Sequence, residues 1–254
     1  MPSDMLNAHA IKEEVKHPAI QQIHVFEQLD STNTWALQHA QCGDVCLAEQ
    51  QTAGRGRRGR NWYSPQQGNL YLSLKWCFAQ PSKHFGLLSL LVAISLAECL
   101  QELGLKGHGV KWPNDILYQN KKLGGILLET KGNLNEVVIG IGLNIAMQQS
   151  TQINQAWTSL NQCLKQTVNR NQLISQLLNR LAENLSTFPQ LDLPAFKQQW
   201  QSWNLLENQT ISIAYQKQIL HGKVIGITAD GMLEVELDNG NRQVFSAVDV
   251  SVRV

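Results

Sequence analysis

An arginine-rich stretch in the first quarter of the chain has the residue types that bind phosphate or carboxylate oxygens. Residues 54–60 read GRGRRGR, and Trp62 follows shortly after. The planar guanidinium of arginine pairs with such oxygens in a bidentate manner and keeps its charge. Glycine permits positive φ and a close approach of the backbone. We therefore expect a mobile, glycine-hinged loop that closes over an anionic ligand.

The same letters satisfy a G-x-G-x-x-G dinucleotide fingerprint, but their context does not. In that fingerprint the third glycine opens a helix whose N-terminus faces the pyrophosphate. Residues 60–65, RNWYSP, are not the start of such a helix, and the next predicted element is another strand. A P-loop is excluded because no Gly-Lys-Ser/Thr follows. A nucleic-acid contact and a solvated basic loop both stay open from these residues alone.

A second dense group surrounds Pro113, where Lys111, Asn114 and Asp115 lie near a tight polar turn. Lys122 comes next, just before a glycine pair on a predicted strand. A lysine at a strand edge beside paired glycines can touch a substrate that lies flat on the glycine backbone. Asp115 could bind Mg²⁺ or orient an incoming amine. The alternative, that Lys122 is an ordinary turn lysine, stays open.

Two further features point to a pocket. Gly140 and Gly142 lie two residues apart on one predicted strand, and Asn144 follows on the same strand. Glycine inside a strand weakens it unless something approaches closely, although a bulge would also explain the pair. The Ser-Thr-Asn run at 31–33 begins a predicted helix, and capping accounts for one of its three polar residues. These residues would line a cavity with hydroxyl and amide groups.

Composition narrows the class of protein. The 254 residues carry a formal net charge of +1 at pH 7, so any basic site must be local. The five cysteines form no C-x-x-C pair, and we expect reduced, unligated thiols. The first residues lack a signal peptide, and the apolar stretch at 85–103 contains serines, a glutamate and a cysteine and indicates a buried helix. A soluble cytoplasmic protein is expected.

Hydrophobic periodicity predicts the elements that position these residues. Strands are expected at 23–30, 44–51, 69–78, on either side of Pro113 within 107–118, at 122–130 and at 135–147. Helices are expected at 31–40, 85–103, 169–188 and 193–203. From about residue 208, short strands alternate with Asp-Gly and Asn-Gly turns, which predicts a small SH3-like barrel. The expected divisions are 1–22 (an extension), 23–205 (catalytic) and 206–254 (SH3-like).

A glycine-lined pocket with hydroxyl donors, one lysine and an arginine loop suits activation of a carboxylic acid by adenylation. The motifs DSTN, QQTAGRGRRGRNWYSP, NLYLSLKW, KWPNDILY, KKLGGILLE and VVIGIGLNIA, in this order, resemble the biotin–protein ligase family. The resemblance is dense over 23–147 and looser to the C-terminus. It implies an α+β fold of the class II aminoacyl-tRNA synthetase and biotin ligase kind, with a mixed sheet, flanking helices and a C-terminal SH3-like domain. Lipoate or octanoate ligases of the same fold are the alternative, and a nucleic-acid-binding regulator is the rival from another class.

The resemblance implies that biotin and MgATP form biotinyl-5′-AMP, and that the acyl group passes to a lysine of a biotin carboxyl carrier protein. The implied catalytic residues are Arg57, Lys111, Asp115 and Lys122, with Asp115 also near Mg²⁺. The implied biotin-binding residues are Ser31, Thr32, Asn33, Gln51, Gly54, Arg55, Gly56, Arg57, Lys122, Gly125, Gly140 and Gly142. The implied ATP-binding residues are Arg57, Arg58, Arg60, Trp62, Asn114 and Asn144.

Some members of the family carry an N-terminal DNA-binding domain. Only about thirty residues precede Ser31 here, and they are not patterned as a helix-turn-helix. We therefore expect a ligase without repressor function, with no DNA and no membrane among its partners. A homodimer stays open, because edge strands that could pair across a dimer are not distinguishable from ordinary ones.

Overall fold

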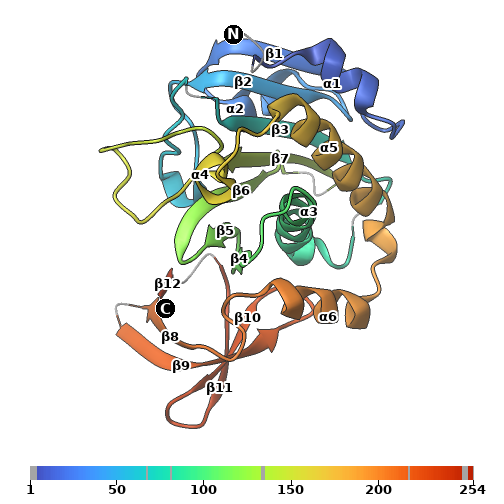
Figure 1. Ribbon diagram of the computed structural model, residues 1–254. Helices are drawn as coiled ribbons and strands as arrows, with labels where there is room; N and C mark the ends of the chain where they lie inside the picture. The colour runs from blue at the N-terminus through green and yellow to red at the C-terminus, as the bar shows by residue number, and fades with distance from the viewer. Residues whose placement is uncertain are drawn as a thin grey trace.

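The structure is a computed structural model that describes residues 5–66, 68–80, 82–132, 135–216, 218–247 and, for the backbone alone, 251–253. A seven-stranded sheet with helices packed against it forms the larger part, and a five-stranded sheet at the C-terminus forms the smaller (Figure 1). The larger sheet has the order β1-β2-β3-β7-β6-β5-β4. β1 and β2 run parallel, and the other neighbouring pairs are antiparallel. The predicted mixed sheet is confirmed.

The predicted strands and helices are present within a few residues of the expected bounds, and the helices α1 Ala8–Glu14 and α4 Leu160–Leu164 were not predicted. The strands of the larger sheet are β1 Ile23–Leu29, β2 Val45–Gln51, β3 Leu70–Cys77, β4 His108–Lys111, β5 Asp115–Tyr118, β6 Lys121–Glu129 and β7 Glu136–Leu143. The helices are α1 Ala8–Glu14, α2 Thr32–His39, α3 Leu88–Glu102, α4 Leu160–Leu164, α5 Arg170–Thr187 and α6 Leu193–Trp203, with short 3₁₀ turns η1 Arg57–Gly59, η2 Phe85–Leu87 and η3 Phe188–Gln190.

The two faces of the larger sheet differ because side chains alternate along a strand. On β3, Leu70, Leu72 and Leu74 are fully or almost fully buried on the face that packs against helices. Tyr71 and Ser73 lie between them in sequence and face the other side. The register pairs Tyr71 with Gly142 and Ser73 with Gly140. The two glycines of β7 therefore share one face with polar side chains of β3.

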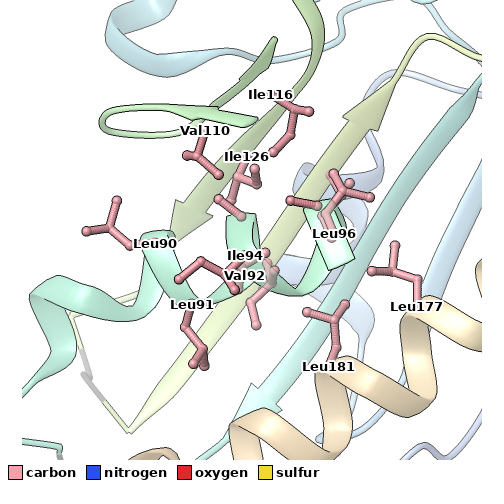
Figure 2. Packing of buried hydrophobic residues seen from close by; sticks show 14 of the residues in the cluster. Leu90, Leu91, Val92, Ile94, Leu96, Val110, Ile116, Ile126, Leu177 and Leu181 are labelled. Atoms are coloured by element: carbon pink, nitrogen blue, oxygen red, sulfur yellow. The ribbon is translucent and has the colours of Figure 1, made fainter. Parts of the chain in front are cut away.

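Helix α3 fills the centre of the protein between the sheet and α5. Figure 2 shows its apolar side chains among Val110, Ile116 and Ile126 of three strands, with Leu177 and Leu181 of α5 on the other side. The segment Phe85–Glu102 is apolar and long enough to cross a membrane, but 67% of it is buried within the protein. It is the central core helix, as its sequence predicted.

The smaller sheet has the order β11-β10-β9-β8-β12 and is antiparallel throughout. Its strands are β8 Thr210–Tyr215, β9 Gln218–Ile227, β10 Leu233–Leu237, β11 Arg242–Phe245 and β12 Ser251–Arg253. The turn between β9 and β10 contacts the part of the protein that contains the larger sheet. Trp112 Nε1, just after β4, donates to Gly231 O of this turn at 2.9 Å. A Cβ at Gly86 would overlap the backbone carbonyl of Asp230, so only glycine allows this close approach.

Helix α1 was not predicted from the sequence. Its Ile11 is fully buried, and two asparagines of α5 hold its ends. Asn171 Oδ1 accepts from the backbone N–H of Asn7 at 3.0 Å, and Asn179 Oδ1 accepts from that of Lys16 at 2.7 Å. The helix has seven residues and one apolar anchor, which gives too little periodicity to detect. Its place is set by contacts with α5.

The prediction that all cysteines are unligated was wrong for one pair. Cys42, in the turn between α2 and β2, forms a disulfide with Cys77 at the end of β3, with a Cα–Cα distance of 5.6 Å. The two residues are 35 positions apart and meet only because β2 pairs with β3. Spacing alone therefore gave no signal. Cys46, Cys99 and Cys163 are free thiols.

Candidate active site

The floor of the candidate site is a patch of glycine backbone on β6 and β7. Gly125 pairs with Gly142, and Gly140 pairs with Leu127. The indole of Trp62 lies on this floor: a Cβ at residue 142 would come within 2.5 Å of Trp62 Cε2. The close approach explains why glycine is placed inside these strands.

The arginine stretch is a compact hairpin rather than an open loop. Trp62 N donates to Gly54 O at 2.9 Å, and Gly56 N donates to Arg60 O at 2.7 Å. At the tip, Arg58 and Gly59 have φ of 58° and 69°, in the left-handed region that glycine favours. These conformations turn the chain back on itself within a few residues. The hairpin therefore presents its guanidiniums from a turn closed by backbone hydrogen bonds.

The tip of the hairpin contacts the C-terminal domain. Arg57 Nη2 donates to Ala247 O at 2.8 Å, and Arg58 Nη2 donates to the same oxygen at 2.7 Å. Arg57 Nη1 also donates to Asn114 Oδ1 at 3.1 Å. Burial, and then the nearby Arg58 charge, lower the pKa of Arg57, with Asp115 acting in the opposite direction. An anionic ligand here would relieve the crowding of positive charge.

A chain of hydrogen bonds lies beneath the hairpin at the start of α2. Ser31 caps the helix, since its Oγ accepts from the N–H of Thr34. Thr32 N and Thr32 Oγ1 donate to Gln51 Oε1 at 2.8 and 3.1 Å. Gln51 Nε2 donates to Ser64 Oγ at 2.8 Å, and Ser64 Oγ donates to the carbonyl of Trp62. The polar helix start is thus joined to the end of the arginine hairpin.

Lys122 and Asp115 form an ion pair across β5 and β6. Lys122 Nζ lies 2.7 Å from Asp115 Oδ1, and both side chains are largely buried. The same Nζ lies 5.3 Å from the centroid of the Trp62 ring, within the range of a cation–π contact. The sequence predicted Lys122 beside the paired glycines, and the structure places it at the edge of the glycine floor. Asp115 directs the ammonium toward the site.

These groups surround a cavity of about 590 Å³, a size typical of small-molecule sites. Its lining includes most of the predicted residues: Ser31, Thr32, Asn33, Gln51, Arg55, Gly56, Arg57, Arg58, Arg60, Trp62, Lys111, Asn114, Asp115, Lys122, Gly125, Gly140 and Gly142. Six cationic side chains stand against one acidic side chain, Asp115, in that lining. A chain that is nearly neutral overall has concentrated its positive charge here, which suits a polyanionic ligand.

Two predicted residues do not line the cavity. Gly54 lies at the base of the hairpin, where a Cβ would come within 2.5 Å of Ser64 Oγ. Asn144 is buried and its Nδ2 donates to Thr158 O at 3.1 Å. Its own N–H donates to Leu123 O, so it holds the segment after β7 against β6. Their predicted roles toward biotin and nucleotide stay predictions.

Sequence reasoning missed several lining residues. Asn154 and Gln155 enter because the segment after β7 runs beside β6, where Lys122 N donates to Ala156 O and Thr158 N donates to Lys122 O. Ala247 enters from the C-terminal domain. These three residues lie far from the motifs in the sequence, and their residue types do not by themselves indicate a binding site. Trp112, next to Pro113, is the exception, because it stands inside a motif that was recognised.

Comparisons with known proteins agree with this geometry. Residues 25–144 match the biotin/lipoate A/B protein ligase family, and residues 208–253 match the biotin protein ligase C-terminal domain. The bifunctional ligase/repressor BirA of Escherichia coli K12 is 36% identical over 246 residues, which are 93% of this chain and 75% of that protein. The chain belongs to the biotin protein ligase family.

Further relatives support this membership. The biotin–[acetyl-CoA-carboxylase] ligase of Mycobacterium tuberculosis is 35% identical over 169 residues, which are 63% of this chain and 62% of that protein. A solved structure of the Aquifex aeolicus biotin protein ligase, in complex with biotin and ATP, is 27% identical and superposes with a TM-score of 0.79. That alignment covers 91% of this chain and 98% of the Aquifex chain. The predicted family and fold are therefore confirmed.

Proposed function

We propose that this chain activates biotin with MgATP and transfers the biotinyl group to a lysine of a carrier protein, using the cavity beneath the arginine hairpin. The observation that carries the proposal is the joining of a glycine floor, an ion-paired lysine and an ordered group of arginines in one cavity. The positive charge suits a triphosphate, and the Trp62 indole on the floor suits packing against a flat ring system. Membership of the biotin protein ligase family supports biotin as the acid.

In the first step a biotin carboxylate oxygen attacks the α-phosphorus of ATP, and the bond to the β-phosphate breaks as pyrophosphate leaves. Negative charge grows on the phosphate oxygens, so the main need is fixed positive charge. Arg57 and Lys122 would meet the carboxylate and the α-phosphate, and Arg58 and Arg60 the leaving pyrophosphate. Arg57, Arg58 and Lys122 are held by the protein before reaction, which limits the cost of reorganisation.

The biotin head would lie at the start of α2, beside Ser31, Thr32 and Gln51. The acyl chain would run toward Lys122 beside the Trp62 indole, which covers the floor at Gly125 and Gly142. Among the described residues no acceptor lies within hydrogen-bond distance of the buried Nε1 of Trp62. That donor is available to an oxygen or nitrogen of the ligand. Asn114 would complete the nucleotide side, and Asn144 would act from behind it by holding the segment after β7 against β6.

In the second step the lysine amine of the carrier attacks the acyl carbon, and AMP leaves with the electron pair of the C–O bond. The amine must be unprotonated to attack. Asp115 would orient it, and Lys111 would stabilise the departing AMP. The hairpin over the cavity would exclude water from the acyl-adenylate.

Mg²⁺ would enter as MgATP. Mg²⁺ in such sites is held by one or two carboxylates together with substrate phosphates and water. Asp115 is the one carboxylate in the described lining of the cavity, and it is paired with Lys122. The donor set fits an ion that takes most of its ligands from the triphosphate. The ion would neutralise charge on the leaving pyrophosphate.

Three further expectations belong to this proposal. Lipoate or octanoate would not replace biotin. The chain would not bind operator DNA specifically, because its net charge of +1 gives no long-range attraction to phosphates. It would act in the cytoplasm, and a homodimer is left open until its mass in solution is measured.

The test is transfer to a biotin carboxyl carrier domain, followed by mass spectrometry. A gain of one biotinyl group on a single lysine, dependent on ATP and biotin, is expected. Arg57→Ala and Lys122→Ala should slow this reaction about 10²–10³-fold. A carrier that stays unmodified with the wild-type chain would refute the proposal.

A further inference from the structure

Glu129, the last residue of β6, contacts two parts of the site at once. Its Oε1 lies 2.7 Å from Arg55 Nη2, and its Oε2 accepts from Asn33 Nδ2 at 2.9 Å. Arg55 stands near the base of the arginine hairpin, and Asn33 belongs to the polar start of α2. One carboxylate therefore connects the two elements that would hold the adenylate and the biotin head.

The position of Glu129 follows from the sheet. Side chains of β6 alternate, so Glu129 lies on the same face as Gly125 and Leu127. It pairs with Val138 on β7, two residues from Gly140. Its side chain is 19% exposed. The carboxylate is thus at the rim of the glycine floor, partly shielded from water, where a charged hydrogen bond is stronger than at the surface.

Both the nitrogen and the oxygen of the Asn33 side-chain amide form hydrogen bonds within the protein. Nδ2 donates to Glu129, and Oδ1 accepts from the hydroxyl of Ser73 at 2.5 Å. Its side chain also rests on Gly140, where a Cβ would overlap the amide. Asn33 is only 5% exposed. It therefore acts as a connector between the sheet and Glu129 rather than as a free donor for ligand.

Arg55 is turned away from the arginines at the tip. It pairs with Glu129 at the end of β6, whereas Arg57 and Arg58 reach the C-terminal domain. The hairpin is held near its base by the Arg55–Glu129 ion pair and by the Gln51–Ser64 hydrogen bond, and its tip contacts Ala247. Loss of the Arg55–Glu129 ion pair would leave the other contacts and the bonds within the hairpin intact.

We propose that Glu129 is a positioning residue for the ligase reaction, because it fixes the base of the arginine hairpin to the Asn33 end of the biotin-head site through Arg55. The carboxylate does not touch the reacting atoms. It sets the relative placement of two binding elements, so its loss weakens substrate binding more than the chemical step. The inference rests on the proposed function and adds a residue to it.

The test compares Glu129→Gln, Arg55→Gln and the double variant in biotin-dependent exchange of pyrophosphate into ATP. Glu129→Gln keeps the shape and removes the charge. We expect the KM for biotin to rise about tenfold, with kcat changed much less, since a bond to a charged group corresponds to at least one factor of ten in binding. Arg55→Gln should do the same, and the double variant should be no worse than the more affected single one.

The matched control is Glu136→Gln. Glu136, at the start of β7, forms an ion pair with Lys75 of β3, with 3.2 Å between Glu136 Oε2 and Lys75 Nζ. The side chain of Glu136 is half exposed. This variant removes the same charge from a neighbouring strand and should behave as the wild type.

Several results would overturn the proposal: an unchanged KM in Glu129→Gln and Arg55→Gln, a fall in kcat alone, effects that multiply in the double variant, or the same loss in Glu136→Gln. Should Glu129→Gln not fold, Glu129→Asp takes its place, because it keeps the charge and shortens the reach to Arg55 and Asn33, and a biotin KM equal to that of the wild type would overturn the proposal. A wild-type chain without biotin-dependent exchange would refute the proposed function itself. An active wild type with unaffected variants would refute only the role of Glu129.

Discussion

The buried ion pair between Glu49 and Arg170 allows a quantitative test of how the catalytic domain is stabilised. Arg170, at the start of α5, donates to both carboxylate oxygens of Glu49 at 2.8 and 3.1 Å, and to Asn69 O at 3.0 Å. Arg170 is 3% exposed and Glu49 is 7% exposed. Glu49 also accepts from the N–H of Leu6 at 2.8 Å. The pair therefore ties β2, α5 and the N-terminal segment together.

Removing one partner leaves the other charge buried without its counter-ion. Arg170→Met or Glu49→Leu should each lower the free energy of unfolding by about 3–5 kcal/mol. The double variant buries two apolar side chains instead, and among the contacts described above the backbone N–H of Leu6 and the carbonyl of Asn69 each lose a partner. Each of those losses is about 1–3 kcal/mol. The double variant should therefore lose clearly less than the sum of the single losses.

The assay is urea unfolding, monitored by circular dichroism, of the wild type, the two single variants and the double variant. The free energies are compared when all four proteins show the same dependence of unfolding free energy on urea concentration. A coupling energy of about 2 kcal/mol or more is expected for groups in direct contact. Additivity within about 0.5 kcal/mol would refute the reasoning, because it would mean that the two charges do not stabilise each other. Single variants that unfold like the wild type would refute the assignment of the pair to the core.

Further predictions concern other contacts. Reduction of the Cys42–Cys77 disulfide, or Cys42→Ser, should lower the free energy of unfolding by about 3–4 kcal/mol, from the 35-residue separation, and urea unfolding with and without reductant checks this. Trp112→Phe removes the bond to Gly231 O and should cost about 1 kcal/mol, seen as earlier cleavage of the C-terminal domain in limited proteolysis. Burial lowers the pKa of His108, so the unfolded chain binds its proton more readily. The free energy of unfolding should fall as the pH drops below about 6.5, and His108→Gln should flatten that part of the pH profile.

Much of the fold could be predicted because its signals are local. Alternation on β3 and β7 separates the core face from the site face, and the long apolar run of α3 predicts a buried helix. The cavity residues of the motifs were found for a related reason: strained turns, paired glycines and clustered charges are visible within a few neighbours. The resemblance then supplied their roles, which the residues alone left open.

The remaining features depend on contacts between distant segments. Glu129 is an ordinary last residue of a strand until the fold brings its carboxylate within hydrogen-bond distance of Asn33 on α2. Ala247 and Asn154 carry no chemical signal, and they reach the cavity through the packing of other elements. Cys42 and Cys77 meet through strand pairing. The arginine stretch has the conformation of a hairpin because its glycines serve a tight turn and close backbone contacts, and its predicted mobility stays a prediction.

The measurement that tests the central claim most directly is exchange of pyrophosphate into ATP with biotin or lipoate offered separately. The wild-type chain should catalyse exchange with biotin and not with lipoate. Arg57→Ala and Lys122→Ala should each reduce the rate about 10²–10³-fold. Exchange with lipoate alone would contradict the assignment of the acid. Exchange with neither acid would contradict adenylation at this site.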